Sequence, residues 1–401
     1  MKGTRKLYAG VAGVGLLVAL GVGQYWLGTV ATAAQAGGAK QAPRFEVDPL
    51  WPKPFPNHWL LGNTIGVSVD SRNHVWIIHR SSASLGNNEK GMELQPPTSS
   101  HCCKGAPPVI EFDPAGTVVG SWGGPVAGAP YDWPESNHGI TVESNGTVWI
   151  GGNGPADGLV LKFTREGKFI KQIGKKGVKA DSNATDHFFQ VAKIFVDEKG
   201  GEAYISDGYG NKRVAVLDKE TGAFKRYWGA YGNKPSDENL GRYNPSQPLV
   251  QQFRNPVHCA ELSVDNIVYV CDRVNDRIQT FTKEGKFLKE VQIEKDSLAD
   301  GSVWDIVFSK DPQQRFLYLA DGRNQKLHIL DRQSLEVLTS FGEGGRQVGQ
   351  WYGLHSLAVD SAGNLYTTET YEGKRIQKFV YKGLGPITAR YQGTVRPTGT
   401  R

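Results

Sequence analysis

The stretch that decides the fold is PVHCAELSVDNIVYVCDRVNDRIQTF, residues 256–281. Two apolar segments, Val257–Val264 and Ile267–Cys271, are separated by the turn-forming pair Asp265-Asn266, which predicts a hairpin. A third segment, Arg277–Phe281, follows a polar corner and predicts a third strand. Because three strands bury too little apolar surface to be stable alone, the stretch predicts that several such units pack face to face.

The same order of features recurs along the chain: an apolar strand, a turn with an acidic residue, a second strand that ends in polar residues, and a third strand. Besides 256–281, the repeats are Ile65–Arg80 with Pro107–Gly124, Asn137–Gly152 with Val160–Gly174, His187–Asp218, Val303–Asp331 and Gly353–Val380. Six repeats of this size predict an all-β, six-bladed β-propeller. The strand Arg44–Trp51 has no hairpin partner nearby, and we expect it to join the last sheet and close the ring.

The composition agrees with a large, turn-rich β protein. Of the 401 residues, 50 are glycine and 21 are proline, and 39% are hydrophobic, which is enough for an extensive core. The net charge is +6, and half of it comes from Lys2, Arg5 and Lys6. The rest of the chain is therefore close to balanced, which argues against a nucleic-acid partner.

The first 36 residues have a basic start, an uncharged run from Leu7 and a small-residue site at Ala34-Gln35-Ala36. They are typical of a secretory signal peptide, and the uncharged run is also long enough to anchor the chain in a membrane through residues 7–36. Both alternatives predict an exported protein, which is periplasmic, secreted or anchored to the outer face of the cytoplasmic membrane. The predicted order continues with a linker at 37–43, the propeller at 44–385 and a C-terminal tail at 386–401.

Histidines stand at or just before the first strand of four repeats: His138, His187, His258 and His355. The inner strands of a propeller start at one mouth of the central channel, so we expect these side chains to converge there. Three neutral imidazoles that leave a coordination position open suit a catalytic zinc ion. A single histidine near a strand start is also compatible with a hydrogen-bonded structural role.

The second strands end in a further polar set, which consists of Arg80, Tyr209 and Arg273. An arginine in such a channel can hold a carboxylate or polarise a carbonyl group. The alternative for Arg273 is a salt bridge at the blade edge with Asp276 or another acid. The alternative for Tyr209 is a ring that packs within a turn.

Several motifs, in this order, resemble the NHL-repeat propeller of peptidyl-α-hydroxyglycine α-amidating lyase (peptidylamidoglycolate lyase). They are VSVDSRNHVWIIHR, HFFQ with SDGYGNKR, NPVHCAEL with CDRVNDRIQTF, and GLHSLAVD, and they span Ile65 to about Phe379. The resemblance implies three zinc ligands, a catalytic tyrosine and two substrate-binding arginines. Carried over residue by residue, the zinc ligands are His187, His258 and His355. The catalytic tyrosine is Tyr209, and the substrate-binding arginines are Arg80 and Arg273. The resemblance gives His138 a structural role close to the metal.

The resemblance also implies a reaction, in which an N-(α-hydroxyalkyl) amide is split into an amide and an aldehyde, glyoxylate in the peptide case. Zinc would lower the pKa of the substrate hydroxyl, Tyr209 would take its proton, and the arginines would hold the carboxylate and the carbonyl. The structural calcium of the family uses a backbone carbonyl at Val67 and an aspartate where this chain has Ser356, so calcium loses a carboxylate ligand here. A small hydroxyamide, a ureido compound or a peptide fragment would all suit this chemistry as substrate, and the oligomeric state stays open.

The four cysteines need a separate account. Cys259 and Cys271 flank the Asp265 turn symmetrically, so they either form a disulfide across the hairpin or remain free buried thiols. Cys102 and Cys103 are adjacent, which is compatible with a vicinal disulfide and, less favourably, with a soft metal site that includes the neighbouring histidine. An exported chain would allow both disulfides to form.

Two other classes of function remain open from the sequence. A non-catalytic propeller would bind a protein or a glycan at its rim or channel mouth, and Arg80, Tyr209 and Arg273 would not need to meet the histidines. A calcium-dependent, lactonase-like hydrolase would place several Asp, Glu or Asn side chains at the strand starts, where this chain has histidines. The lyase interpretation is the one that accounts for both sets of residues.

Overall fold

The structure is a computed structural model, and it describes residues 40–397. The expected signal or anchor at residues 1–36 lies outside the described residues. Within the described part of the chain, no helix is long and apolar enough to cross a membrane. The ordered elements are almost entirely β-strands, with four short 3-10 helices, η1 (Ser81–Ser84), η2 (Asn87–Glu89), η3 (Ala230–Gly232) and η4 (Arg273–Asn275).

Six four-stranded sheets form the blades of the predicted propeller. Blade one has β3 (Thr64–Val69), β4 (Val75–His79), β6 (Val109–Phe112) and β7 (Val118–Trp122), and blade two has β8 (Asn137–Val142), β9 (Val148–Gly152), β10 (Leu159–Phe163) and β11 (Phe169–Gly174). Blade three has β12 (Val191–Asp197), β13 (Glu202–Asp207), β14 (Arg213–Asp218) and β15 (Phe224–Trp228), and blade four has β16 (Val257–Leu262), β17 (Ile267–Asp272), β18 (Arg277–Thr282) and β19 (Phe287–Gln292). Blade five has β20 (Asp305–Phe308), β21 (Phe316–Asp321), β22 (Lys326–Asp331) and β23 (Val337–Phe341).

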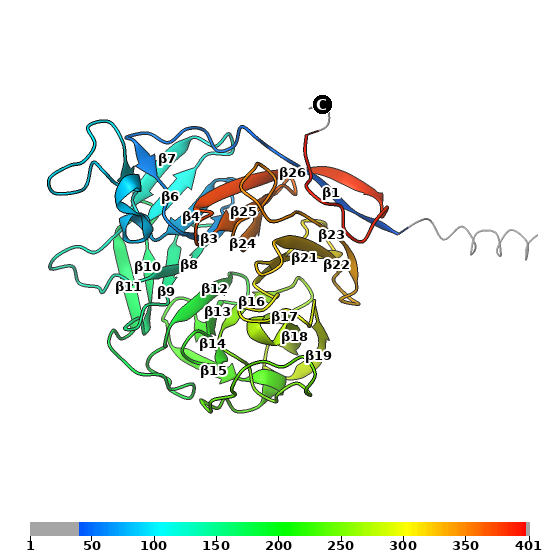
Figure 1. Ribbon diagram of the computed structural model, residues 1–401. Helices are drawn as coiled ribbons and strands as arrows, with labels where there is room; N and C mark the ends of the chain where they lie inside the picture. The colour runs from blue at the N-terminus through cyan, green and yellow to red at the C-terminus, as the bar shows by residue number, and fades with distance from the viewer. Residues whose placement is uncertain (1–39, 398–401) are drawn as a thin grey trace, which may run out of the picture. The chain divides into compact units, whose positions relative to one another are not determined.

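Blade six closes the ring with a strand from the other end of the described chain. It has β24 (Leu354–Val359), β25 (Leu365–Glu369) and β26 (Arg375–Pro386), and its outermost strand is β1 (Gln41–Val47). The predicted closing strand is thus confirmed, although it starts at Gln41 rather than at Arg44. The inner strands β3, β8, β12, β16, β20 and β24 each pack on the next, and β24 packs on β3, so the blades surround one central channel (Figure 1).

Apolar clusters fill the spaces between neighbouring blades. Between blades five and six, Phe45 of β1 packs edge-on against Tyr318 at 5.4 Å between ring centroids and also contacts Phe341. Between blades one and two, Trp76 is fully buried in a cluster with Val109 and Ile150. Such packing of alternating side chains from both sheets is what makes the blades mutually stabilising.

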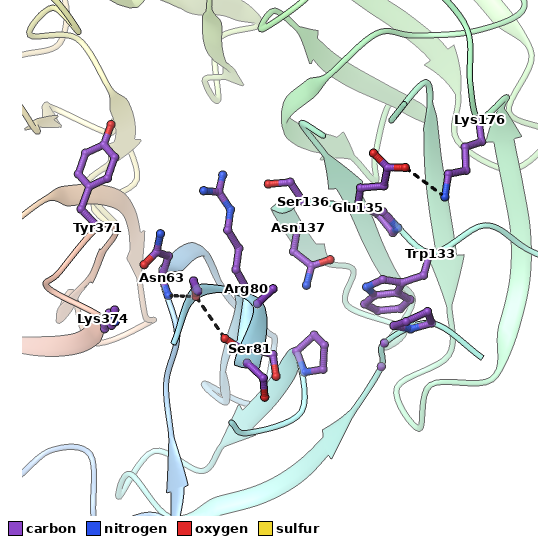
Figure 2. Close-up of a pocket in the computed structure, with 18 of the residues that line it drawn as sticks. Asn63, Arg80, Ser81, Trp133, Glu135, Ser136, Asn137, Lys176, Tyr371 and Lys374 are labelled. Carbon is purple, nitrogen blue, oxygen red and sulfur yellow. Dashed lines mark hydrogen bonds and ion pairs between the residues drawn. The ribbon is translucent and has the colours of Figure 1, made fainter. Parts of the chain in front are cut away.

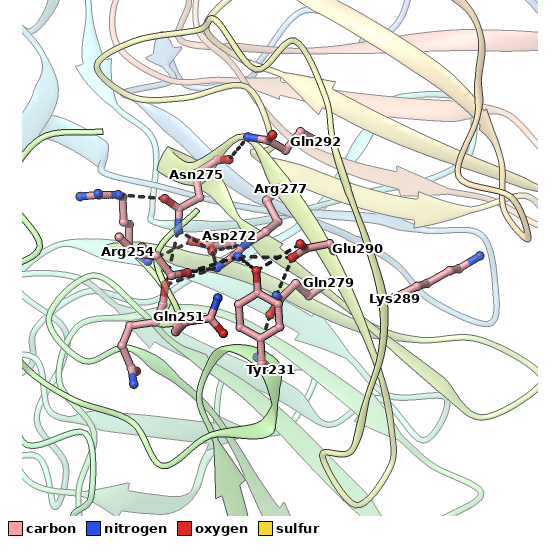
Figure 3. A network of polar contacts seen from close by, with 12 residues as sticks. Tyr231, Gln251, Arg254, Asp272, Asn275, Arg277, Gln279, Lys289, Glu290 and Gln292 are labelled. Carbon is pink, nitrogen blue, oxygen red and sulfur yellow. Dashed lines mark hydrogen bonds and ion pairs between the residues drawn. The ribbon is translucent and has the colours of Figure 1, made fainter. Parts of the chain in front are cut away.

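A repeated polar motif connects the second strand of a blade to its third strand. In blade four, Asp272 at the end of β17 accepts hydrogen bonds from Arg277 Nε at 2.8 Å, from Asn275 Nδ2 at 2.8 Å and from the backbone N–H of Arg254 at 3.0 Å (Figure 3). In blade three, Asp207 accepts from Arg213 Nε at 2.8 Å in the same way. In both blades the buried carboxylate holds the turn that follows it, so the next one or two residues are directed to the channel mouth.

A long segment, residues 81–106, is inserted between β4 and β6 of blade one. This inserted segment contains η1, η2 and β5 (Lys104–Gly105), and β5 pairs in parallel with β2 (Trp59–Leu60).

The four cysteines form two disulfides. Cys259 and Cys271 are direct partners in the register of β16 and β17 and form one, and Cys102 and Cys103 form a vicinal disulfide. After β26, the chain continues along blade five, where the backbone at Tyr391 pairs in parallel with Ser340 of β23.

Candidate metal centre

Three histidines meet at the mouth of the central channel. The imidazole nitrogens of His138, His258 and His355 that face one another lie within 4.8 Å, and all three side chains are buried. The ring centroids are 5.2 Å apart for His138 and His258, and 4.9 Å for each of the other two pairs. Each histidine is the second residue of an inner strand, in β8, β16 and β24. Because these strands belong to alternate blades of a six-bladed ring, they supply the three rings from three evenly spaced directions.

The outer ring nitrogens are held by the next blade along the ring. Nδ1 of His138 bonds to the carbonyl of Ala192 at 2.6 Å, Nδ1 of His258 bonds to that of Trp304, and Nδ1 of His355 bonds to that of Ile65 at 3.0 Å. A carbonyl oxygen only accepts, so Nδ1 carries the proton in each neutral ring, and the Nε2 lone pair is left for the centre. Such hydrogen bonds from the second ring nitrogen to a carbonyl orient the histidine ligands of metal ions.

The electrostatics keep these imidazoles neutral. Burial, with the nearby charge of Arg80, lowers the pKa of His138 to about 3. Burial and neighbouring imidazoles and guanidinium groups lower the pKa of His258 and His355 well below the usual value. Neutral nitrogen donors that converge in this way fit a divalent transition-metal ion.

The structure differs from the sequence-based expectation for the third histidine. His187 lies in the loop before β12, where its Nδ1 bonds to Asp186 Oδ1 at 2.7 Å, and it is not part of the cluster. The reason is the strand register: the second residue of β12 is Ala192, and blade three has no histidine there. His138, which the resemblance assigned a structural role, takes the place instead.

Tyr209 and Arg273 lie directly over the histidines. The Tyr209 hydroxyl is 3.0 Å from His138 Nε2 and 3.1 Å from His258 Nε2, and it accepts a hydrogen bond from Arg273 Nη1 at 3.1 Å. The Arg273 guanidinium stacks on Trp304, 4.4 Å from the ring centroid, and it forms an ion pair with Asp300 at 3.7 Å.

The positions of Tyr209 and Arg273 follow from the buried Asp–Arg contacts described above, Asp207 with Arg213 in blade three and Asp272 with Arg277 in blade four. Arg273 directly follows Asp272, and Tyr209 follows Asp207 by two residues, with Gly208 between them. A Cβ atom at Gly208 would collide with the backbone of Val257 in the next blade, so only glycine allows the turn that presents Tyr209 to the channel.

Arg80 reaches the same space from blade one. Its Nη2 donates to Asn153 Oδ1 at 3.1 Å, while its Nε is buried without a partner. Its charge acts on Tyr209 and on the rings of His138 and His355. The side chain lines a cavity of 1070 Å³ that opens between blades one, two and six (Figure 2). The structure therefore brings together Arg80, Tyr209, Arg273, His258 and His355 of the predicted set.

Two further side chains of this mouth were not predicted from the sequence. Asn137 and Tyr371 line the same cavity as Arg80 (Figure 2). The Asn137 Nδ2 donates to the carbonyl of His79 at 2.9 Å, and its Oδ1 is buried without a partner. Tyr371 also lines a second cavity of 450 Å³ with Trp304 and Asp300. A signal for Tyr371 exists: it follows Glu369 by two residues, as Tyr209 follows Asp207.

A second group of potential ligands, Asp70, His74 and Glu111, lies in blade one. Arg165 Nη2 bonds to Asp70 Oδ2 at 2.7 Å and also to Glu111 Oε1, and Arg72 Nη2 lies 3.2 Å from Glu111 Oε1, so two guanidinium groups already balance the two carboxylates. The three histidines are therefore the better metal candidate among the described residues.

A buried lysine occupies the channel between the inner strands. Lys193 Nζ lies 2.6 Å from Asp305 Oδ1 and 2.8 Å from Glu261 Oε1, and so connects β12, β20 and β16. Burial opposes its charge, but the two carboxylates outweigh burial and raise the pKa of Lys193. At the position where the family has its calcium-binding aspartate, Ser356 Oγ contacts His355 Nδ1 at 3.0 Å and supplies no carboxylate for Ca²⁺.

Comparisons with known proteins agree with the motifs. No protein-family model matches the chain. It is 26% identical over 358 residues to NHL repeat-containing protein 3 of Mus musculus, which covers 84% of each chain. It is 27% identical over 249 residues to the peptidyl-glycine alpha-amidating monooxygenase of Mus musculus, which covers 59% of this chain and 22% of that protein. Over 240 residues it is 25% identical to a Caenorhabditis elegans protein named probable peptidyl-alpha-hydroxyglycine alpha-amidating lyase, which covers 58% of this chain and 60% of that one.

The chain resembles NHL-repeat proteins and amidating lyases. The resemblance expected from the motifs is thus confirmed, although the matches span only part of the amidating proteins. Among solved structures, a catalytically inactive virginiamycin B lyase from Staphylococcus aureus aligns with 85% of this chain and 89% of its own, with a TM-score of 0.45 and 16% identity. The candidate metal centre lies at the channel mouth of this NHL-like propeller.

Proposed function

We propose that the protein is a zinc-dependent lyase that cleaves an N-(α-hydroxyalkyl) amide into an amide and an aldehyde such as glyoxylate. The observation that carries the proposal is the meeting of three Nε2 atoms with the Tyr209 hydroxyl and the Arg273 guanidinium at one point. The distant similarity to amidating lyases supports the same class of reaction.

Each group has a part in this chemistry. A zinc ion held by His138, His258 and His355 would supply Lewis-acid polarisation of the substrate hydroxyl. Tyr209 takes the hydroxyl proton, because its oxygen lies over the histidines and the hydrogen bond from Arg273 stabilises negative charge on that oxygen. Arg80 and Arg273 hold the carboxylate and the carbonyl of the substrate, since each has a buried Nε without a partner. Collapse of the deprotonated hydroxyl to a carbonyl then expels the amide nitrogen.

The proposal extends to the setting in which the protein works. The basic, then uncharged, leader and the two disulfides together support an exported protein, either periplasmic, secreted or held at the outer face of the membrane by residues 7–36. The substrate is a small-molecule or peptide α-hydroxyamide.

The test combines metal analysis with product detection on the purified chain. We expect about one zinc per chain and glyoxylate release from N-benzoyl-α-hydroxyglycine. His138→Ala and His258→Ala should each lose zinc and activity, whereas His187→Ala, a matched histidine outside the cluster, should retain both. Tyr209→Phe should retain zinc and lower kcat by about 10²-fold or more.

A protein with neither zinc nor glyoxylate release would overturn the proposal and favour a non-catalytic propeller that binds a partner at its mouth. Loss of zinc in His187→Ala with retention in His138→Ala would overturn the assignment of ligands.

A further inference from the structure

The repeats place a second tyrosine at the position of Tyr209. In blade three, the first residue of β12, Val191, pairs with Asp207, and Tyr209 stands two residues later. In blade six, the first residue of β24, Leu354, pairs with Glu369, and Tyr371 stands two residues later. Blades three and six are three steps apart in a ring of six, so the two tyrosines approach the channel mouth from opposite sides.

The arginines repeat this relation in another pair of opposite blades, blades one and four. In blade one, Thr64 pairs with His79 and Arg80 follows it. In blade four, Val257 pairs with Asp272 and Arg273 follows it. The mouth therefore has two cations and two phenols, each pair from opposed blades, around the three histidines.

Tyr371 lines two cavities beside the candidate metal centre. It lines both the cavity with Arg80 and the smaller cavity with Asp300, and its ring meets Trp304 at 6.5 Å, edge to face. The charged and titratable groups that face it are Asp300, Arg273, Tyr209 and Arg80. Figure 2 shows its side chain at the wall opposite Asn137 and Glu135, with Arg80 between.

The proposed reaction leaves one role unassigned. When the C–N bond breaks, its electron pair goes to the amide nitrogen, which must gain a proton to leave as a neutral amide. Tyr209 lies against the histidines and receives the hydroxyl proton. We propose that Tyr371 is the acid that protonates the departing amide nitrogen, an inference that rests on the proposed lyase function.

The step balances when Tyr209 starts as a phenolate and Tyr371 as a phenol. The O–H bond of the substrate breaks as Tyr209 takes its proton, a C=O bond forms, the C–N bond breaks, and the O–H bond of Tyr371 breaks as the new N–H bond forms. Tyr209 then gives its proton to solvent, so no reagent other than water is needed. Arg80 and Arg273 stabilise the resulting phenolate of Tyr371. Because Tyr371 is 46% exposed, it regains its proton from solvent. Burial of the other half raises the pKa of Tyr371, so its phenol keeps the proton near neutral pH until the nitrogen needs it.

Asn137 gives an independent reason to place the amide in this cavity. Its buried Oδ1 has no partner and lines the same cavity as Tyr371, and an unpaired buried acceptor is unfavourable until a donor arrives. A substrate amide N–H is such a donor. It lies in the amide plane on one side of the nitrogen, and the electron pair released by the C–N bond lies in the same plane on the side that faced the carbon, so contacts to Asn137 and to Tyr371 do not compete.

The test is the Tyr371→Phe variant on a series of ring-substituted N-benzoyl-α-hydroxyglycines, from 4-nitro to 4-methoxy, in single-turnover experiments. We expect the rate to fall by about 10²-fold for the 4-methoxy compound, whose leaving amide is the more basic, and by much less for the 4-nitro compound. The rate should therefore depend more steeply on the acidity of the leaving amide than it does for the wild type. Zinc content and the Kd for unreactive N-benzoylglycine should stay within twofold of the wild type.

The control is Tyr391→Phe, a half-exposed tyrosine whose hydroxyl bonds to Glu294 away from the mouth. It should leave the rates and their dependence on the leaving amide unchanged. A Tyr371→Phe variant with unchanged rates, or with an equal fall in rate for all substrates, overturns the inference. Tyr209 would then be the group that protonates the departing amide nitrogen. If the wild type releases no glyoxylate from any compound, the lyase proposal fails, and this inference fails with it.

Discussion

At the scale of single residues, one position in an inner strand decides which side chain reaches the channel. Successive residues of a strand point to opposite faces, so a side chain must stand at the right register position to face the centre. His138, His258 and His355 all occupy the second position of their strands, as the segments NHG, VHC and LHS show. His187 belongs to a loop and is separated from this position by four residues.

A pH-dependent prediction concerns Asp276, which follows the Asp272 network of blade four. Burial raises the pKa of Asp276 to about 8, so the folded protein holds a proton that an unfolded chain releases near pH 4. Stability should therefore fall as the pH rises between these values. Asp276→Asn keeps the acceptor for the Ser302 N–H and suits the left-handed backbone at this position, with φ of 52°.

We expect Asp276→Asn to match the wild type in thermal unfolding at pH 4 and to exceed its Tm increasingly from pH 4 to pH 8. The measurement is Tm against pH for both proteins by calorimetry. A Tm difference that is the same at every pH would contradict the prediction.

At the scale of elements, the inner strands are connected by ionic contacts in addition to apolar packing. Lys193 of β12 is paired with Glu261 of β16 and Asp305 of β20, and Asp305 Oδ2 also accepts the backbone N–H of Leu357 in β24. Four consecutive inner strands thus share one network close to the metal centre. A network of this kind is costly to break, because removal of one partner leaves buried charge uncompensated.

The corresponding prediction is that Lys193→Met lowers the free energy of unfolding by about 3–5 kcal/mol, since two buried carboxylates lose their counter-ion. Denaturant unfolding measures the change. Lys168→Met, at an exposed turn position of blade two, is the matched control and should change the free energy by less than about 0.5 kcal/mol. An equal effect of the two substitutions would show that the network does not stabilise the ring.

At the scale of the whole molecule, closure depends on β1. The strand contributes Phe45 to a core with Tyr318, Phe341 and Tyr381, and it covers the outer edge of β26. Closing the last blade with a strand from the start of the propeller joins the two ends of the ring and limits free sheet edges. The ring in turn holds the three histidines together, because they come from separate blades.

Phe45→Ala should therefore destabilise the propeller by about 3–5 kcal/mol and increase amide hydrogen exchange first in blade six. Leu50→Ala, at a residue that is 83% exposed, serves as the control and should have little effect. Exchange that increases equally in all blades would contradict a closing role for β1, since it would indicate only a general loss of stability.

The sequence by itself determined the number of blades, the order of their strands and the closing strand, because alternating apolar residues and turn pairs such as Asp265-Asn266 act over short distances. It also determined that Arg80, Tyr209 and Arg273 stand at corresponding strand ends. Only the tertiary structure decided that His138 joins His258 and His355 and that Tyr371 lines the same cavity as Arg80. The physical reason is that strand register around the closed ring sets which side chains face the channel, and residues more than 200 positions apart become neighbours only when β24 packs on β3.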